Sequence, residues 1–178
     1  GKSVMTGSSP IGDRIGERVI DERISVFDDP TIDGAIGSRP VDDEGIPSRR
    51  MALIDHGVVS NFLYDLQTAG RMNATSTGAA GRGLSTLPGP RTSVLDVAPG
   101  ETPYDDLFLG IKEGIMVERL LGAGQGNEMG GDFKANVSLG YKIENGKIVG
   151  RIKDTMISGN VYDALSKLEA VSDTAEWV

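Results

Sequence analysis

Three consecutive carboxylates, Asp42-Asp43-Glu44, are the group in this sequence whose types and spacing best fit chemistry. Neighbouring carboxylates can act as general acid and general base when their environments separate their pKa values. Arg39, Arg49 and Arg50 are close in the sequence, and ion pairing with them would equally explain the cluster. Because no further group completes a mechanism, we expect hydrogen bonds and arginines to hold these carboxylates, and we assign no catalytic residue.

The sequence contains one histidine, His56, and no cysteine. A zincin helix needs two histidines on one face, so these residues do not supply that motif. Without thiols there is no disulfide, no thiolate metal site and no cysteine nucleophile, and the cytoplasm is the expected compartment. His56 falls at a predicted hairpin turn, so we expect it at the surface.

A second pattern, Asp29, Thr31, Asp33 and Gly34, imitates the opening of a calcium-binding loop. The twelfth position of that loop would be Pro40, whereas calcium loops of this type end in glutamate and are flanked by helices. We therefore expect no calcium site and no other metal site here.

The glycine clusters at 78–83 and 122–131 match neither the dinucleotide fingerprint nor the P-loop, which indicates turns. The 18 basic and 26 acidic residues give a net charge of −8, which argues against nucleic-acid binding. No apolar run approaches the about 18 residues of a membrane span. The length of 178 residues predicts one domain or two small lobes.

In chain order, residues 1–23 form a polar N-terminal arm with at most a short helical turn, and residues 24–178 form one domain. A short strand over 24–27 ends at Asp28-Asp29-Pro30, because proline donates no hydrogen bond to a sheet. A long loop follows over residues 30–47. Loops of more than about 12 to 15 residues are uncommon unless they bind something, so this loop is a candidate binding segment.

The apolar runs 50–55 and 58–66 predict a hairpin around Asp55-His56-Gly57, where glycine allows positive φ. Residues 67–91 are rich in small side chains and are expected to be irregular. A strand over 93–97 follows.

Thr102 is a predicted helix N-cap, with Pro103 at the first helical position and Gly114 after the end. The apolar run 115–121 is a predicted strand. Strict alternation of apolar and polar residues over 133–143 predicts a half-buried strand.

Asn145-Gly146 supplies the two residues of a type I′ turn, and 148–157 returns antiparallel. Asn160 is expected to cap a final helix with an apolar stripe that extends to Val171. The predicted class is α+β, mainly antiparallel hairpins with two helices and long glycine-rich loops, and barrel-like closure is left open.

Several short motifs occur along the chain in an order that is similar to that of a known protein family. They are Asp28-Asp29-Pro30, Gly37-Ser38-Arg39-Pro40, Asp42-Asp43-Glu44-Gly45-Ile46-Pro47, Arg49-Arg50, Leu53-Ile54, Gly57-Val58, Ser76-Thr77-Gly78, Lys112-Glu113-Gly114-Ile115, Gly131-Asp132-Phe133, Ile143-Glu144-Asn145-Gly146 and Ile157-Ser158-Gly159-Asn160. Their order resembles the C-terminal domain of the PmbA/TldD family, and most closely its PmbA branch, also called TldE.

The resemblance implies a role in proteolysis, since family members are cytoplasmic peptidases or peptidase subunits that were historically labelled modulators of DNA gyrase. A TldD subunit carries a zinc-binding His-Glu-x-x-x-His helix, whereas a PmbA subunit lacks it and pairs with TldD. Zinc is therefore expected in the TldD partner or outside these residues. The expected partners are a PmbA/TldD-type subunit, in a homo- or heterodimer, and a peptide substrate, with no nucleic acid and no membrane.

The leading hypothesis is a non-catalytic C-terminal domain whose loops line a peptide-accepting cavity or a subunit interface. An oligomerisation scaffold without substrate contact, and autonomous hydrolysis by the carboxylates, stay open as alternatives. The candidate substrate or interface residues are Asp28, Asp29, Asp42, Glu44, Arg49, Ser76, Thr77, Gly78 and Asn160.

Overall fold

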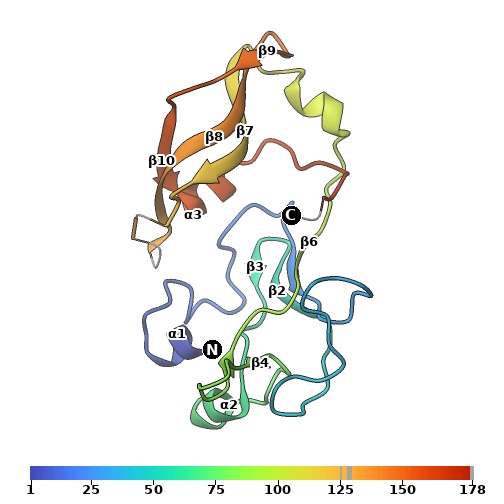
Figure 1. Ribbon diagram of the computed structural model, residues 1–178, viewed down its shortest axis with the longest axis vertical. Coiled ribbons are helices and arrows are strands. Elements are labelled where there is room, and N and C mark those ends of the chain that lie inside the picture. Colours follow the sequence, from blue (N-terminus) through green and yellow to red (C-terminus); the bar gives the residue numbers. More distant parts are fainter. Residues whose placement is uncertain (125, 128–129, 177–178) are drawn as a thin grey trace. The chain divides into compact units, whose positions relative to one another are not determined.

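The computed structural model describes residues 1–124, 126–127 and 130–176, so residues 125, 128 and 129 of the second glycine cluster lie outside it. The chain divides into two compact units, residues 1–98 and 99–178 (Figure 1). Antiparallel sheets dominate both units, and the helices are short, which confirms the predicted α+β class. The sheets of the described residues are open, so barrel-like closure does not occur there. None of the described helices is long and apolar enough to cross a membrane.

The first unit is organised by a four-stranded sheet in the order β3-β2-β1-β6. Its strands are β1 (Val26–Asp28), β2 (Met51–Asp55), β3 (Val58–Val59) and β6 (Leu95–Val97). In the central strand β1, Val26 lies opposite Ile54 of β2 and Val97 of β6. Apolar side chains on and around this sheet form the core: Ile20, Ile24, Val59, Ala79, Ala80 and Val94.

The predicted hairpin is present between β2 and β3, and its loop is the two-residue segment His56-Gly57. Both residues have positive φ, 46° and 76°, as a type I′ turn requires. The second strand is shorter than predicted, because the amides of Ser60 and Asn61 both turn back to the carbonyl of Leu53. The chain then leaves the sheet.

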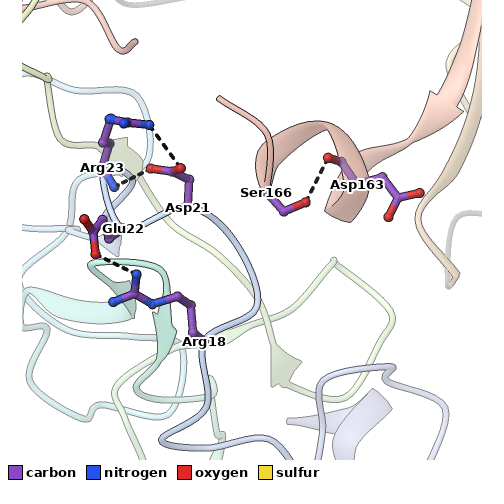
Figure 2. A network of polar contacts seen from close by, with 6 residues as sticks. All are labelled: Arg18, Asp21, Glu22, Arg23, Asp163 and Ser166. Atoms are coloured by element: carbon purple, nitrogen blue, oxygen red, sulfur yellow. Dashed lines mark hydrogen bonds and ion pairs between the residues drawn. The ribbon is translucent and has the colours of Figure 1, made fainter. Parts of the chain in front are cut away.

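The N-terminal arm contains one helical turn, α1 (Lys2–Met5), as predicted. Further on, the arm pairs with the edge of β3, where the amide of Gly16 donates to the Val59 carbonyl and the Val59 amide donates to the Glu17 carbonyl. Ion pairs also occur along the arm (Figure 2), between Arg18 and Glu22 at 2.6 Å and between Arg23 and Asp21 at 3.1 Å. Such exposed pairs contribute little stability, so the backbone pairing with β3 is the stronger attachment.

The expectation that residues 67–91 are irregular is wrong at two places. Helix α2 (Leu66–Arg71) begins at Asp65, whose carboxylate accepts the Thr68 amide at 2.7 Å. Strands β4 (Ala80–Gly81) and β5 (Gly89–Pro90) form a small antiparallel pair. Both elements are too short to give a periodic apolar pattern, so composition alone did not reveal them.

The second unit is built on the long strand β8 (Asp132–Glu144), with β7 (Glu113–Leu121) along one side. On the other side, β10 (Met156–Asn160) pairs with its first part and β9 (Lys147–Arg151) with its last part. The predicted alternation along β8 is confirmed, since Ala135, Val137 and Ile143 are buried. The turn at Asn145-Gly146 has positive φ at both residues, 49° and 76°. The returning segment 148–157 is divided between two strands rather than forming one.

The helix predicted from Thr102 is a single 3-10 segment, η1 (Tyr104–Phe108), without a side-chain cap. Thr102 is instead used in a parallel bridge to Ser172, which competes with a capping role. The last helix, α3 (Val161–Leu165), is capped by Asn160 as predicted but ends well before Val171. There the Ser166 hydroxyl donates to the Asp163 carbonyl (Figure 2).

Candidate functional site

Asp42 is the centre of the predicted site, and the residue is only 4% exposed. One carboxylate oxygen, Oδ1, accepts the amides of Glu44 and Ile46, both at 2.9 Å. The other, Oδ2, accepts the amide of Ala80 at 3.0 Å. Because both oxygens are engaged in backbone hydrogen bonds, this carboxylate orders the loop and is poorly placed to take a proton from a substrate.

The two neighbouring carboxylates are engaged in the same way. Asp43 Oδ2 accepts the Arg82 amide at 2.7 Å, and Glu44 Oε2 accepts the amide of Leu66, the first residue of α2, at 2.8 Å. The expectation that hydrogen bonds hold the cluster is confirmed. No arginine side chain forms an ion pair with these three carboxylates within the described ranges, so the second half of that expectation is wrong.

Arg39 crosses the same region and binds neutral groups. Its Nη1 donates to the carbonyl of Ala80 and its Nη2 to the hydroxyl of Ser93, both at 2.9 Å. Ala80 is therefore held on both sides, with its amide on Asp42 and its carbonyl on Arg39. Sequence spacing gave no sign of this role for Ala80, since backbone groups carry no residue signature.

Asp28 is the second buried carboxylate, at 3% exposure. Its Oδ1 accepts two amides, from Ser93 at 2.7 Å and Val94 at 3.2 Å. Burial raises the pKa of Asp28 above its ordinary value, while these two hydrogen bonds and the charge of Arg39 act in the opposite direction. The carboxyl group connects β1 to the segment that leads into β6.

The neighbouring residue, Asp29, is held by Thr31 and Arg50. Its Oδ1 accepts the amide of Thr31 at 3.0 Å and the hydroxyl at 2.5 Å, and its Oδ2 lies 3.3 Å from Arg50. Arg50 also lies 3.6 Å from Asp96, and its guanidinium carbon is 3.6 Å from the centre of the Phe27 ring. Asp29 and Thr31 of the apparent calcium pattern thus form a local turn.

Ser76 and Thr77 form hydrogen bonds with Tyr64, and Gly78 lies against the 41–50 loop. The Thr77 hydroxyl accepts the Tyr64 amide at 2.8 Å, and the Thr77 amide donates to the Tyr64 carbonyl at 3.0 Å. Gly78 has φ +71°, and a Cβ there would come within 2.6 Å of the carbonyl oxygen of Pro47. Only glycine permits this close contact between the 76–78 segment and the 41–50 loop.

Two of the predicted site residues do not join this cluster. Arg49 is exposed and makes no hydrogen bond or ion pair within the described part of the chain. Asn160 belongs to the second unit, where its Oδ1 accepts the Tyr162 amide and its Nδ2 donates to the Gly130 carbonyl and to Asp132. A structural role therefore accounts for Asn160.

A serine, an aspartate and the histidine do meet at the β2–β3 turn, although sequence spacing did not indicate it. His56 Nδ1 lies 2.9 Å from Asp55 Oδ1, and Ser25 Oγ lies 3.5 Å from the same oxygen. In a catalytic triad the imidazole stands between the hydroxyl and the carboxylate. Here the Ser25 hydroxyl meets the carboxylate and the His56 amide, so the order of a triad is not reproduced.

The described residues contain no group of three or more histidine, cysteine, aspartate or glutamate side chains that could hold a metal ion. The carboxylate acceptors of Asp28 and Asp42 are directed at backbone amides. As predicted, His56 lies at the surface, with a side-chain exposure of 79%. The geometry of this region therefore fits a preorganised loop surface better than a reaction centre.

The chain is similar to several known proteins. It is 37% identical over 97% of its length to a metalloprotease of Methanocaldococcus jannaschii and 33% identical over 95% of its length to a metalloprotease TldD homologue of Haemophilus influenzae. It spans 38% and 35% of those two proteins.

Two solved structures are also similar. TldE from Thermococcus kodakarensis matches 96% of this chain with a TM-score of 0.86 and 27% identity. A proposed modulator of a DNA gyrase from Thermotoga maritima matches 96% with a TM-score of 0.85 and 31% identity. In each case the match covers 39% of that structure's chain.

A family profile described as "PmbA/TldA metallopeptidase C-terminal domain" matches residues 1–178. Similar proteins carry TldD, TldE and gyrase-modulator names, as the order of sequence motifs led us to expect. The chain belongs to the PmbA/TldD family, and it corresponds to the C-terminal domain of that family.

Proposed function

We propose that this chain is the C-terminal domain of a PmbA/TldE-like subunit in a cytoplasmic metallopeptidase complex that acts on peptides or unfolded proteins. In this proposal the chain itself performs no chemistry. The observation that carries it is the engagement of Asp42: three backbone amides occupy its carboxylate, and its neighbours Asp43 and Glu44 each hold a further amide. A metal-dependent reaction would then use ligands supplied by another region or subunit.

The TldE-like role in this proposal needs no metal ligand from this chain. Peptidase zinc sites use histidine and carboxylate ligands, and cysteine in other zinc enzymes. This chain contains His56 as its one histidine and has no cysteine, and His56 lies beside Asp55 at an exposed turn. The relatives named as metalloproteases are more than twice as long as the region matched here, which leaves room for a metal-binding segment in them.

We assign the 28–50 loop, with the 76–78 segment that supports it, to the wall of a substrate cavity or a subunit interface. Its fold is fixed from within by the carboxylates, so it can present exposed side chains without reorganising on binding. Arg49 is the exposed cation of this loop that lacks a partner in the described ranges. An exposed guanidinium suits the carbonyl oxygens or carboxylates of a peptide.

A photo-cross-linking side chain placed at Arg49 tests this assignment in the assembled complex. The complex is stripped of metal with a chelator so that a labelled unfolded peptide is bound but not cleaved. We expect cross-links between position 49 and the peptide, and few from a matched substitution at Arg71, the exposed last residue of α2. Cross-links to the other subunit alone would favour the scaffold alternative, in which the loop touches no substrate.

The substitution Glu44→Gln tests the proposal that this chain contributes no catalytic residue. A glutamine can still accept the Leu66 amide, so the loop should keep its fold. General acid or base catalysis contributes about 10²- to 10⁴-fold to a rate, so a catalytic Glu44 would show a loss of that size. We expect kcat of the metal-loaded complex to stay within about twofold of the parent value.

A further inference from the structure

Two dipeptides of this chain, Asp33-Gly34 and Asn145-Gly146, have the chemistry for a spontaneous rearrangement of the backbone, and each type occurs once. In such a pair the glycine nitrogen can attack the side-chain carbonyl carbon of the preceding residue and close a five-membered succinimide ring. Glycine favours this attack because it has no Cβ to crowd the ring. By side-chain chemistry alone the asparagine pair reacts faster, since a neutral amide carbon is more open to attack than an ionised carboxylate.

The structure protects the asparagine pair. The Gly146 amide donates to the carbonyl of Ile111 at 2.9 Å, within the turn that joins β8 to β9. The backbone is also packed closely there, because a Cβ at Gly146 would come within 3.3 Å of the carbonyl oxygen of Leu109. To attack the Asn145 side chain, the nitrogen must lose its proton and turn away from this acceptor. The reaction therefore needs a local opening of the turn first.

The aspartate pair has no such protection. Asp33 and Gly34 are the two central residues of a turn in which the Ala35 amide donates to the Ile32 carbonyl at 3.4 Å. A turn of this kind uses the amide of its fourth residue and leaves the amide of its third residue unbonded. Accordingly, neither the Gly34 amide nor the Asp33 carboxylate forms a hydrogen bond or ion pair with the described residues, and both residues are exposed.

The surroundings of Gly34 also leave room for the ring. Gly34 has φ +75°, and nothing lies within 4 Å of the position that a Cβ would take. The ends of the same segment are held firmly, since the Arg39 amide donates to the Pro30 carbonyl at 2.9 Å. At Gly37 the backbone lies so close to the Ser93 carbonyl oxygen that a Cβ would come within 2.5 Å of it. The turn can therefore rearrange while its base stays in place.

We propose that Asp33 is a site of spontaneous isomerisation to isoaspartate, with water as the co-reactant, and that Asn145 is spared. The Gly34 nitrogen loses its proton and bonds to Asp33 Cγ, and the hydroxyl of the protonated carboxyl group leaves as water. A water molecule then opens the ring. Opening at Cγ restores aspartate, whereas opening at the former main-chain carbonyl leaves the chain running through Cγ, with no net change of composition. The inference goes beyond the proposed function and does not depend on it.

The product would change the shape of the loop tip without cutting the chain. Isoaspartate adds the Cβ atom of residue 33 to the main chain, so the bond from the Ala35 amide to the Ile32 carbonyl no longer fits its turn. Ile36, which is 99% exposed, follows directly and would be redirected. The amides that Asp42 accepts come from residues outside this turn, so the rest of the 28–50 loop keeps its framework.

Peptide mapping of aged full-length protein tests the site. The folded protein and a sample unfolded in urea are incubated at neutral pH, digested and analysed by mass spectrometry with electron-transfer dissociation, which distinguishes isoaspartate from aspartate. We expect isoaspartate to accumulate at position 33 of the folded protein while Asn145 stays intact, and Asn145 to react first in urea. Position 33 unchanged in the folded protein, or Asn145 deamidating there as fast as in urea, would overturn the proposal.

The variant Asp33→Asn separates the effect of structure from that of side-chain chemistry, because it places an asparagine-glycine pair at both sites of one molecule. The Asp33 side chain has no partner in the described part of the chain, so the variant should fold like the parent, which circular dichroism checks. In the folded variant, position 33 should deamidate roughly tenfold faster than Asn145 or more, since a bonded amide reacts only after local opening. The difference should vanish in urea. Equal rates in the folded variant, or a difference that persists in urea, would contradict protection by the fold.

Discussion

Asp42 and Ala80, 38 residues apart in the sequence, are joined by a hydrogen bond of 3.0 Å from the Ala80 amide to Asp42 Oδ2. The carbonyl of Ala80 accepts a hydrogen bond from Arg39 on its other side. A buried carboxylate and a guanidinium thus bind the two backbone polar groups of one residue, Ala80. The polar residues that mark the 28–50 loop therefore serve to fix backbone, and a substrate or partner would meet the exposed residues that this framework presents.

Asp42→Asn should be clearly destabilising. The carboxylate accepts amides on both of its oxygens, whereas an asparagine has one acceptor oxygen and an amide group that would face an N–H donor. At least one buried amide loses its partner, which costs about 1–3 kcal/mol. Urea unfolding of the full-length protein measures this loss, with Asp43→Asn as the control, since Asp43 accepts a single amide in an exposed position. Equal losses in both variants would contradict the assignment.

The same substitution at Asp28 should have a different outcome. Both amides that Asp28 accepts are bonded to Oδ1, so an asparagine oxygen can keep both. Burial raises the pKa of Asp28, which means that folding disfavours the charged form of this carboxyl group relative to the unfolded chain. We expect Asp28→Asn to be at least as stable as the parent at neutral pH, although the two aspartates are equally buried.

The stability difference between the parent protein and Asp28→Asn should depend on pH, in a direction that the raised pKa of Asp28 sets. A carboxyl group whose pKa is raised on folding adds stability below its unfolded pKa and loses this contribution as pH rises through the folded pKa. The stability of the parent relative to Asp28→Asn should therefore fall from its highest value, below pH about 4, as the pH increases. Unfolding curves for both proteins across the acidic range give this difference directly. A difference that grew with pH would show that the hydrogen bonds and Arg39 outweigh desolvation.

The elements that sequence patterns predicted well are those with local causes. Alternation along β8, the Asn145-Gly146 turn and the Asn160 cap each depend on residues within a few positions of one another. The family resemblance rested on the same local motifs. Predictions from such signals depend little on the rest of the fold.

The elements that sequence patterns missed depend on contacts between distant segments. Helix α2 has six residues and contains Gly70, so it needs the cap from Asp65 and the contact with Glu44 to persist. The predicted helix from Thr102 loses its cap residue to the pairing with Ser172. At the candidate site, Arg39 and Arg50 bind other groups, and backbone amides occupy the carboxylates of residues 42–44.

Gly78→Ala tests the contact between the 76–78 segment and the 41–50 loop. Alanine at φ +71° costs about 1 kcal/mol, and its methyl group would also overlap the Pro47 carbonyl. Gly45→Ala is the matched control, since Gly45 has φ +80° with nothing within 4 Å of the added methyl. Thermal or urea unfolding should show a loss for Gly78→Ala that exceeds the Gly45→Ala loss by about 1 kcal/mol or more. Equal losses would mean that the Pro47 carbonyl moves away from the added methyl group without a loss of stability.

His56→Asn tests whether this chain contributes a metal ligand to the complex. Asparagine tolerates the positive φ of 46° at this turn, so the hairpin should remain folded while the imidazole is removed. His56 is the one histidine of the chain, and its Nδ1 contacts Asp55 in an exposed position. We expect the metal content of the purified full-length complex, measured by inductively coupled plasma mass spectrometry, and its peptidase kcat to match the parent values. Loss of metal with retained stability would instead make His56 a ligand, and the non-catalytic assignment of this domain would then be wrong.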